Sequence, residues 1–164
     1  MNAIGNKWLG QETGHRAAQR ASIESPQIEE EFLMAIQNIS VEISPGELID
    51  KITILEIKSE RMTDHDKLKN VRTELATLIA CRDLVIESSP KLIELSGQLK
   101  EVNESLWKIE DDIRDCERHR DFGSQFVELA RSVYKSNDRR AALKRQINDL
   151  LGSRIIEEKS YAEY

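Results

Sequence analysis

The sequence is poor in the residues that build tight turns and β-structure. Of its 164 residues, 7 are glycine, 3 are proline and 5% are aromatic. These figures argue against a β-sandwich, a β-barrel, a collagen-like chain and a low-complexity chain. Because 39% of the residues are hydrophobic and 33% are charged, the composition instead favours long amphipathic helices. The length suits one domain.

Several classes of function are also disfavoured. No apolar run is long enough to cross a bilayer, and the N-terminal stretch is too interrupted for a signal peptide, so we expect neither. A net charge of −6 and a pI of about 5.2 disfavour nucleic acid as a partner, since neutralising phosphates takes clustered Lys and Arg. Cys81 and Cys116 lack metal-ligand spacing and fit the reduced thiols of a cytoplasmic protein. No catalytic triad, P-loop, dinucleotide-binding or zinc motif occurs, so we predict no cofactor.

The first part of the chain differs from the rest. Residues 1–38 are polar and punctuated by glycine and serine, and we expect a largely flexible N-terminal extension. Apolar residues at every fourth position indicate a short helix over residues 27–36. Residues 39–164 are expected to form a helical bundle domain.

Start and stop signals divide this domain into helices. Ser44 and Ser89 are each followed by proline, which is typical of an N-cap and a first helical position. Glu47 stands three residues after Ser44 and completes a capping box. Asp121, Phe122 and Gly123 are expected to break the chain between two helices, and a kink is expected at Ser136 and Asn137. The expected helices cover residues 45–62, 66–86, 90–118, 124–134 and 137–151.

Residues 90–118 carry the clearest apolar pattern. Apolar positions alternate in steps of three and four, as in a coiled-coil seam, and residues 66–86 repeat this spacing. If the chain folds back at Ser88 and Ser89, the two seams match in register, so we predict an antiparallel hairpin between these helices. The first helix is apolar on more than one side and needs a second cover. The predicted fold class is all-α: an antiparallel helical bundle with a coiled-coil-like helical hairpin.

A basic segment is the first candidate site. Residues 131–145 carry six basic side chains against one carboxylate, Asp138. A helix start at Asn137 would add free N–H groups and a helix dipole, and Arg139 or Arg140 would hold a phosphate or carboxylate through paired donors. Alternatively, these side chains pair with acidic groups on the first and third helices. The candidate anion-binding or partner-binding residues are Arg131, Tyr134, Lys135, Asn137, Arg139, Arg140 and Lys144.

Carboxylates form a second candidate site. Glu47 and Asp50 share a face of the first helix, and Glu110 lies on the third helix among other acidic residues. Converging oxygens of this kind bind hard cations, which makes these three the candidate acidic or metal-binding residues. Against a metal, Glu47 already has a capping role, and such spacing arises by chance in a chain this charged. No metal is therefore predicted.

A polar strip flanks the seam of the third helix. It consists of Asn103, Trp107, Glu110 and Arg114, at steps of four, three and four. A tryptophan is normally covered, and its half-buried polar neighbours would need partners. The strip is therefore either a packing face for later helices or a pocket or self-association face.

Two stretches also resemble a known family. The family is a bacterial and phage family known as domain of unknown function 6165. Its opening is similar to the stretch ISPGELIDKITILEIKSERM, and its closing part is similar to LARSVYKSNDRRAALKRQINDLLGS followed by EEKSY. The resemblance covers about residues 39–161 and implies a small helical protein to which residues 1–38 are an addition. It brings no established activity. Some members are said to lie near genes for surface glycan synthesis, which suggests a link to that process.

Together these observations predict a cytoplasmic interaction or regulatory module rather than an enzyme. It would bind an anion or a protein partner through the basic segment, and its excess of apolar stripes predicts a homodimer. The alternative is a helical enzyme or binding protein for a phosphorylated small molecule, such as a nucleotide or sugar phosphate. In that case Arg139, Arg140 and Lys144 are the anion ligands, and Glu47 and Asp50 are metal or acid–base groups.

Overall fold

The computed structural model describes residues 39–160, which contain four α-helices and no strand. The chain divides into two units, residues 1–41 and 42–164, and all the described helices belong to the second. They are α2 (Pro45–Arg61), α3 (His65–Val85), α4 (Pro90–His119) and α5 (Ser124–Leu150). The predicted all-α fold is confirmed. The extension over residues 1–38, with its expected short helix, lies outside the described residues. None of the described helices is both long and apolar enough to span a membrane.

The helices begin where the sequence signals them. The hydroxyl oxygens of Ser44 and Ser89 each accept a hydrogen bond from the backbone N–H three residues on, at 3.2 Å in both cases. Asp64 caps α3 by accepting two backbone N–H bonds, at 3.0 and 3.1 Å. These bonds satisfy donors that a helix leaves free at its first turn. The capping box is only half formed, because the Glu47 carboxylate bonds Lys144 instead.

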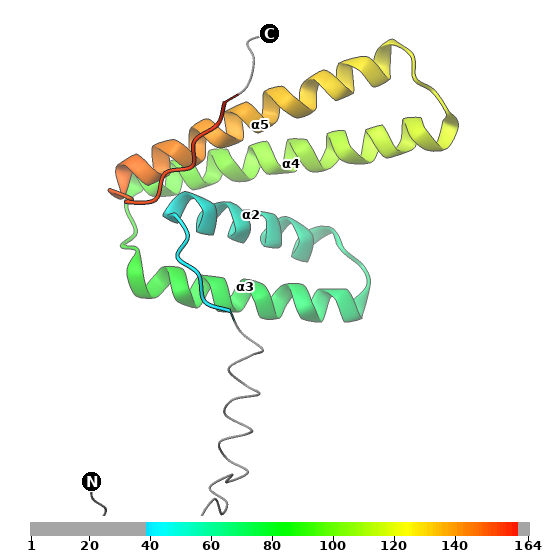
Figure 1. The fold of residues 1–164 in the computed structure, drawn as a ribbon. Helices are drawn as coiled ribbons and strands as arrows, with labels where there is room; N and C mark the ends of the chain where they lie inside the picture. The colour runs from blue at the N-terminus through cyan, green and yellow to red at the C-terminus, as the bar shows by residue number, and fades with distance from the viewer. Residues whose placement is uncertain (1–38, 161–164) are drawn as a thin grey trace, which may run out of the picture. The chain divides into compact units, whose positions relative to one another are not determined.

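Helix α2 is the central element of the second unit. It packs against α3, α4 and α5, while α4 and α5 pack along each other as a long antiparallel hairpin. Figure 1 shows α2 and α4 running in one direction and α3 and α5 in the other. The main core lies between α2, α4 and α5 and consists of Ile49, Leu92, Leu95, Leu99, Val102, Leu143 and Ile147.

The predicted hairpin between residues 66–86 and 90–118 is wrong. Helix α3 packs against α2 and makes no close backbone approach to α4, whose apolar seam faces α5 and α2. At the end of α3, Val85 is 73% exposed. A seam spacing specifies an apolar stripe but not its partner, and any two such stripes match in some antiparallel register. Helix α2, which is apolar on two sides, takes the place between α3 and α4.

Helix α5 is one continuous helix rather than the two that were predicted. The kink expected at Ser136 and Asn137 is absent, because neither proline nor glycine interrupts the hydrogen-bonded turns there. Asn137 is therefore an interior helical residue, and its backbone N–H offers no helix start to an anion. The whole basic segment, residues 131–145, therefore lies on one continuous helix.

Candidate functional site

A group of buried polar side chains crosses the interface of α2, α4 and α5. Asp50 is 1% exposed, and its Oδ1 accepts hydrogen bonds from Arg140 Nε at 2.8 Å and Asn103 Nδ2 at 2.9 Å. Its Oδ2 accepts a further bond from Arg140 Nη2. Asn103 also donates to Thr53 Oγ1 at 3.0 Å. In the described part of the chain, no buried side-chain nitrogen or oxygen lacks a partner, so the buried charge is fully satisfied.

Local sequence explains why the group forms here. Asp50 and Thr53 stand three residues apart, so they share the face of α2 that meets α4 and α5. A carboxylate this deeply buried requires a partner, and a bidentate guanidinium is the strongest that a side chain supplies. The hydrogen bond to Asp50 raises the pKa of Arg140 above its ordinary value, although partial burial opposes the rise. Arg140 is thus a permanent cation committed to Asp50.

A second ion cluster lies one turn further along α5. Lys144 is 8% exposed, and its Nζ donates to Glu47 Oε2 and Glu157 Oε2, each at 2.6 Å. Burial pulls the pKa of Lys144 down, but the two hydrogen bonds outweigh burial and the net pKa is raised. The same bond lowers the pKa of Glu157 below its ordinary value. Lys144 therefore joins α5 to α2 and to the C-terminal segment.

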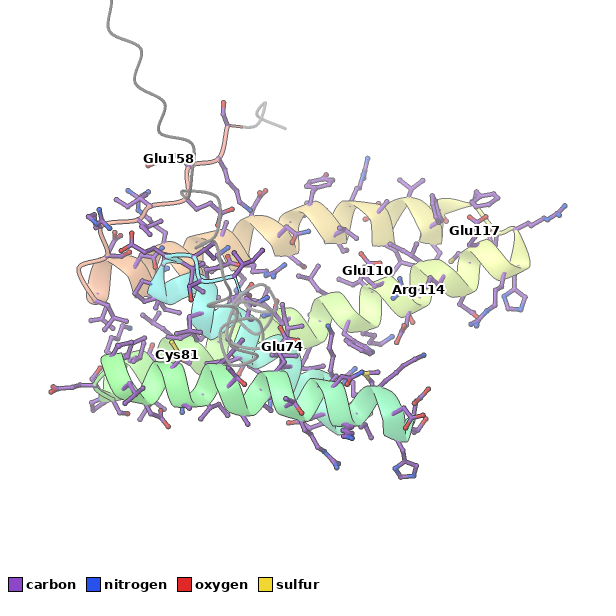
Figure 2. The ribbon with its side chains drawn as sticks, turned by 60° about the horizontal axis from the view of Figure 1, so that its bottom comes forward. Glu74, Cys81, Glu110, Arg114, Glu117 and Glu158 are labelled. Carbon is purple, nitrogen blue, oxygen red and sulfur yellow. The ribbon has the colours of Figure 1, made fainter. Side chains whose placement is uncertain are left out.

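The C-terminal segment reaches Lys144 because the chain reverses after α5. Gly152 adopts a left-handed backbone conformation with φ of 65°, which glycine accepts without steric cost. The segment then runs back along α5 (Figure 1). Glu158 meets Arg145 at 3.1 Å. Figure 2 shows Glu158 on this returning segment beside α5.

The start of α2 lies very close to the end of α5. The Gly46 N–H donates to Asn148 Oδ1 at 2.7 Å. A Cβ on residue 46 would come 2.5 Å from the Lys144 carbonyl oxygen, a distance at which real carbon atoms clash. Only glycine permits this approach. The two stretches that carry the family resemblance therefore build one interface.

The structure does not gather the predicted basic residues into one anion site. Arg140 and Lys144 are held by carboxylates, and Arg131 pairs with Glu128 on its own helix at 3.0 Å. Lys135 and Arg139 are exposed and make no ion pair among the described residues, while Tyr134 is 39% exposed and Asn137 is half-buried. Arg140 and Lys144 therefore follow the alternative prediction, in which the basic side chains pair with carboxylates. The carboxylates lie on α2 and on the C-terminal segment.

The predicted acidic residues do not converge either. Glu47 and Asp50 are held by separate cations, and Glu110 pairs with Arg114 at 3.1 Å in the outer half of α4 (Figure 2). Within residues 39–160, no three His, Cys, Asp or Glu side chains are placed to hold a metal ion. Thr53, Asn148 and Glu157 were not among the predicted site residues. Thr53 stands three residues after Asp50 and Asn148 stands four residues after Lys144. These helical spacings place each of them on the same helix face as a predicted site residue and would have identified both.

The polar strip of α4 lines a cleft, named here the Trp107 cleft. Its volume is about 460 Å³. It opens between the end of α2, the middle of α4 and the middle of α5. The lining residues are Ile54, Ile57, Lys58, Asn103, Leu106, Trp107, Glu110, Arg114, Asn137 and Arg140. Asn103 bonds to α2, which precedes α4, rather than to a later helix, and all four residues of the strip line the cleft.

Comparison with known proteins places the chain in a family but not in a functional class. No curated protein and no solved structure matches it. One family model matches residues 39–164, which includes every described helix and leaves residues 1–38 outside. That match covers well over half of the sequence. The chain belongs to the family of unknown function DUF6165.

Proposed function

We propose that the protein is a cytoplasmic, non-catalytic interaction module that forms a homodimer through the outer part of its α4–α5 hairpin. We name this part the distal arm and define it as residues 109–119 of α4 and 124–136 of α5. Figure 1 shows the hairpin extending well beyond the end of α2. Two helices alone cannot cover both sides of an apolar seam, so part of the apolar surface of the arm remains exposed.

The observation that carries this proposal is an exposed stripe on α5. Val127 is 44% exposed and Tyr134 is 39% exposed. They stand seven residues apart with Arg131 between them, so the three side chains share one helix face. Two further apolar residues of the same part of α5, Leu129 and Val133, are only half-buried. Pairing of two arms would bury these groups within a four-helix bundle.

Charge favours a second copy as the partner. The α4 part of the arm is mainly acidic, and its carboxylates are Glu110, Asp111, Asp112, Asp115 and Glu117. The α5 part of the arm carries Lys135, and Arg139 lies about one helical turn further along α5. Both are exposed and make no ion pair among the described residues. A two-fold axis would place α4 of each copy against α5 of the other, so that opposite charges meet twice.

Binding is favoured over catalysis because the carboxylates that the alternative function would use as metal or acid–base groups are already engaged. Asp50 is held by Arg140 and Glu47 by Lys144. An acid–base role would need these groups near a substrate with freedom to exchange protons. A cytoplasmic location is supported by Cys81, an exposed free thiol, since such thiols persist in reducing compartments.

Sedimentation velocity of the full chain tests the proposal. We expect a dimer at tens of micromolar protein, the range of modest specific association. Val127→Glu replaces an apolar side chain of the stripe with a charge and should raise the dimer dissociation constant at least about tenfold. Leu84→Glu is the matched control, because Leu84 is an apolar residue on α3 with 85% exposure, away from the arm. A monomer at these concentrations, or a dimer that Val127→Glu leaves intact, would overturn the proposal.

A further inference from the structure

The Trp107 cleft combines an apolar wall with Lys58, a cation that makes no ion pair among the described residues. We infer that it binds a small molecule in which one anionic group is attached to a flat aromatic body, such as an aryl phosphate or an aromatic carboxylate. This site goes beyond the proposed association, because its lining comes from α2 and the inner hairpin as well as from the arm. Each feature of the ligand follows from a different set of lining residues.

The size and position of the cleft fit a small molecule. Helix α2 ends at Arg61 while the α4–α5 hairpin continues, so a hollow remains beside the end of α2. Its volume of about 460 Å³ lies within the usual range for small-molecule sites, roughly 300–1,000 Å³. The hollow is bounded by three helices, which would hold a ligand against a rigid frame.

The apolar wall accounts for the aromatic body. Trp107 is half-buried and stands beside Ile54, Ile57 and Leu106 in the lining. An indole prefers offset or edge contact with another ring, and aliphatic side chains complete an apolar slot. The indole N–H makes no hydrogen bond to any described residue and is available to a ligand acceptor.

The charges account for a single anion. Lys58 makes no ion pair or hydrogen bond through its ammonium group to any described residue, so it brings one uncompensated positive charge. The remaining charges cancel in pairs, Arg114 with Glu110 and Arg140 with Asp50. A ligand with several negative charges would meet the Glu110 carboxylate on the same wall, which disfavours a nucleoside triphosphate.

Two further donors belong to residues that line the same cleft. Arg140 uses Nε and Nη2 to bind Asp50, which leaves Nη1 without a partner among the described residues. The side-chain amide of Asn137 also makes no hydrogen bond within residues 39–160, although the residue is half-buried. Together with Lys58, these groups supply the few placed polar contacts that orient a ligand in an otherwise apolar site.

Fluorescence titration of the full chain tests this inference. The sequence has two tryptophans, so Trp8→Phe leaves Trp107 as the only one. The probes are phenyl phosphate, inorganic phosphate, which supplies the anion alone, and phenol, which supplies the ring alone. We expect saturable quenching by phenyl phosphate in roughly the millimolar range, as suits so small a ligand. Each fragment should bind at least about tenfold more weakly.

Variants of single residues identify the site. Lys58→Met should weaken phenyl phosphate at least about tenfold while leaving the response to phenol unchanged. Lys69→Met is the matched control, because Lys69 is an exposed lysine on α3 that also makes no ion pair among the described residues. If circular dichroism shows that the Lys58→Met variant has lost its helical structure, Asn137→Ala serves as a second variant of the same site. Absence of saturable quenching, equal binding of inorganic phosphate, or unchanged affinity in the folded variants would each overturn the inference.

Discussion

Asp50 on α2 and Arg140 on α5 form a bidentate ion pair across 90 positions of sequence. The carboxylate is almost completely buried, so its charge depends on Arg140 and on the Asn103 amide. Burying two charges costs about as much as their attraction returns, but leaving one of them alone is strongly unfavourable. The pair therefore penalises any arrangement of α2 and α5 in which the two groups do not meet.

Removing either partner should lower the free energy of unfolding sharply. For Asp50→Ala we expect a loss of about 3–5 kcal/mol, because Arg140 is left unpaired in a half-buried site. Arg140→Met should cost a similar amount, since it leaves a buried carboxylate. The double variant should lose much less than the sum of the two, and urea unfolding of the four proteins measures the coupling.

An exposed pair on α4 provides the reference for this cycle. Lys108 and Asp112 stand four residues apart with 2.7 Å between Nζ and Oδ2. Exposed helical pairs of this kind couple by only about 0.3–0.5 kcal/mol. Equal coupling energies for the buried and the exposed pair would show that Asp50 and Arg140 depend on each other no more than two exposed side chains do.

Adding one methyl group to two different glycines should have opposite effects. Gly46→Ala forces a carbon against the Lys144 carbonyl oxygen, a backbone atom that cannot rotate away, and overpacking of this kind typically costs about 1–3 kcal/mol. Gly97 lies inside α4, and a Cβ at this position would meet no atom within 4 Å, so Gly97→Ala should stabilise the protein by about 0.5–1 kcal/mol. Thermal and urea unfolding measure both. Equal signs would contradict the close approach of α2 and α5.

Much of the local structure was predictable because it depends on neighbouring residues. Ser44, Ser89 and the prolines after them determine where α2 and α4 begin, and these starts agree with the structure. The glycine that follows the break after α4 likewise lies directly before α5. Caps and turns act over three or four residues, so a single sequence contains all the information that they need.

The pairing of helices was not predictable in the same way. An apolar stripe on residues 66–86 and another on 90–118 matched well, yet α2 lies between them. The burial of Asp50 was also missed as such, because a carboxylate near the start of a helix is normally exposed. Its burial depends on Arg140, which lies far away in sequence and becomes a neighbour only after the fold has formed.

The C-terminal segment should give stability that depends on pH. The hydrogen bond from Lys144 lowers the pKa of Glu157 below its ordinary value of 4.5, so folding favours the ionised carboxylate. The stabilisation is therefore present above about pH 4.5 and is lost as pH falls through the lower pKa of the folded state. Glu157→Gln should be less stable than the original protein at pH 7, and the two should become alike in stronger acid. Urea unfolding from pH 7 down to about pH 3 measures this difference.

The expected difference at pH 7 is small, less than about 1 kcal/mol, because the Glu157 side chain is 46% exposed and solvent screens its interaction. Glu158→Gln is the control: this neighbouring carboxylate meets Arg145 but is 79% exposed, so its removal should change stability even less. Lys144→Met removes the main cause of the lowered pKa of Glu157, so in that background the pH-dependent effect of Glu157→Gln should shrink to the part due to Lys159 and Arg140. A difference between the original protein and the Glu157→Gln variant that stays constant down to about pH 3 would mean that the segment is held by contacts other than this ion pair.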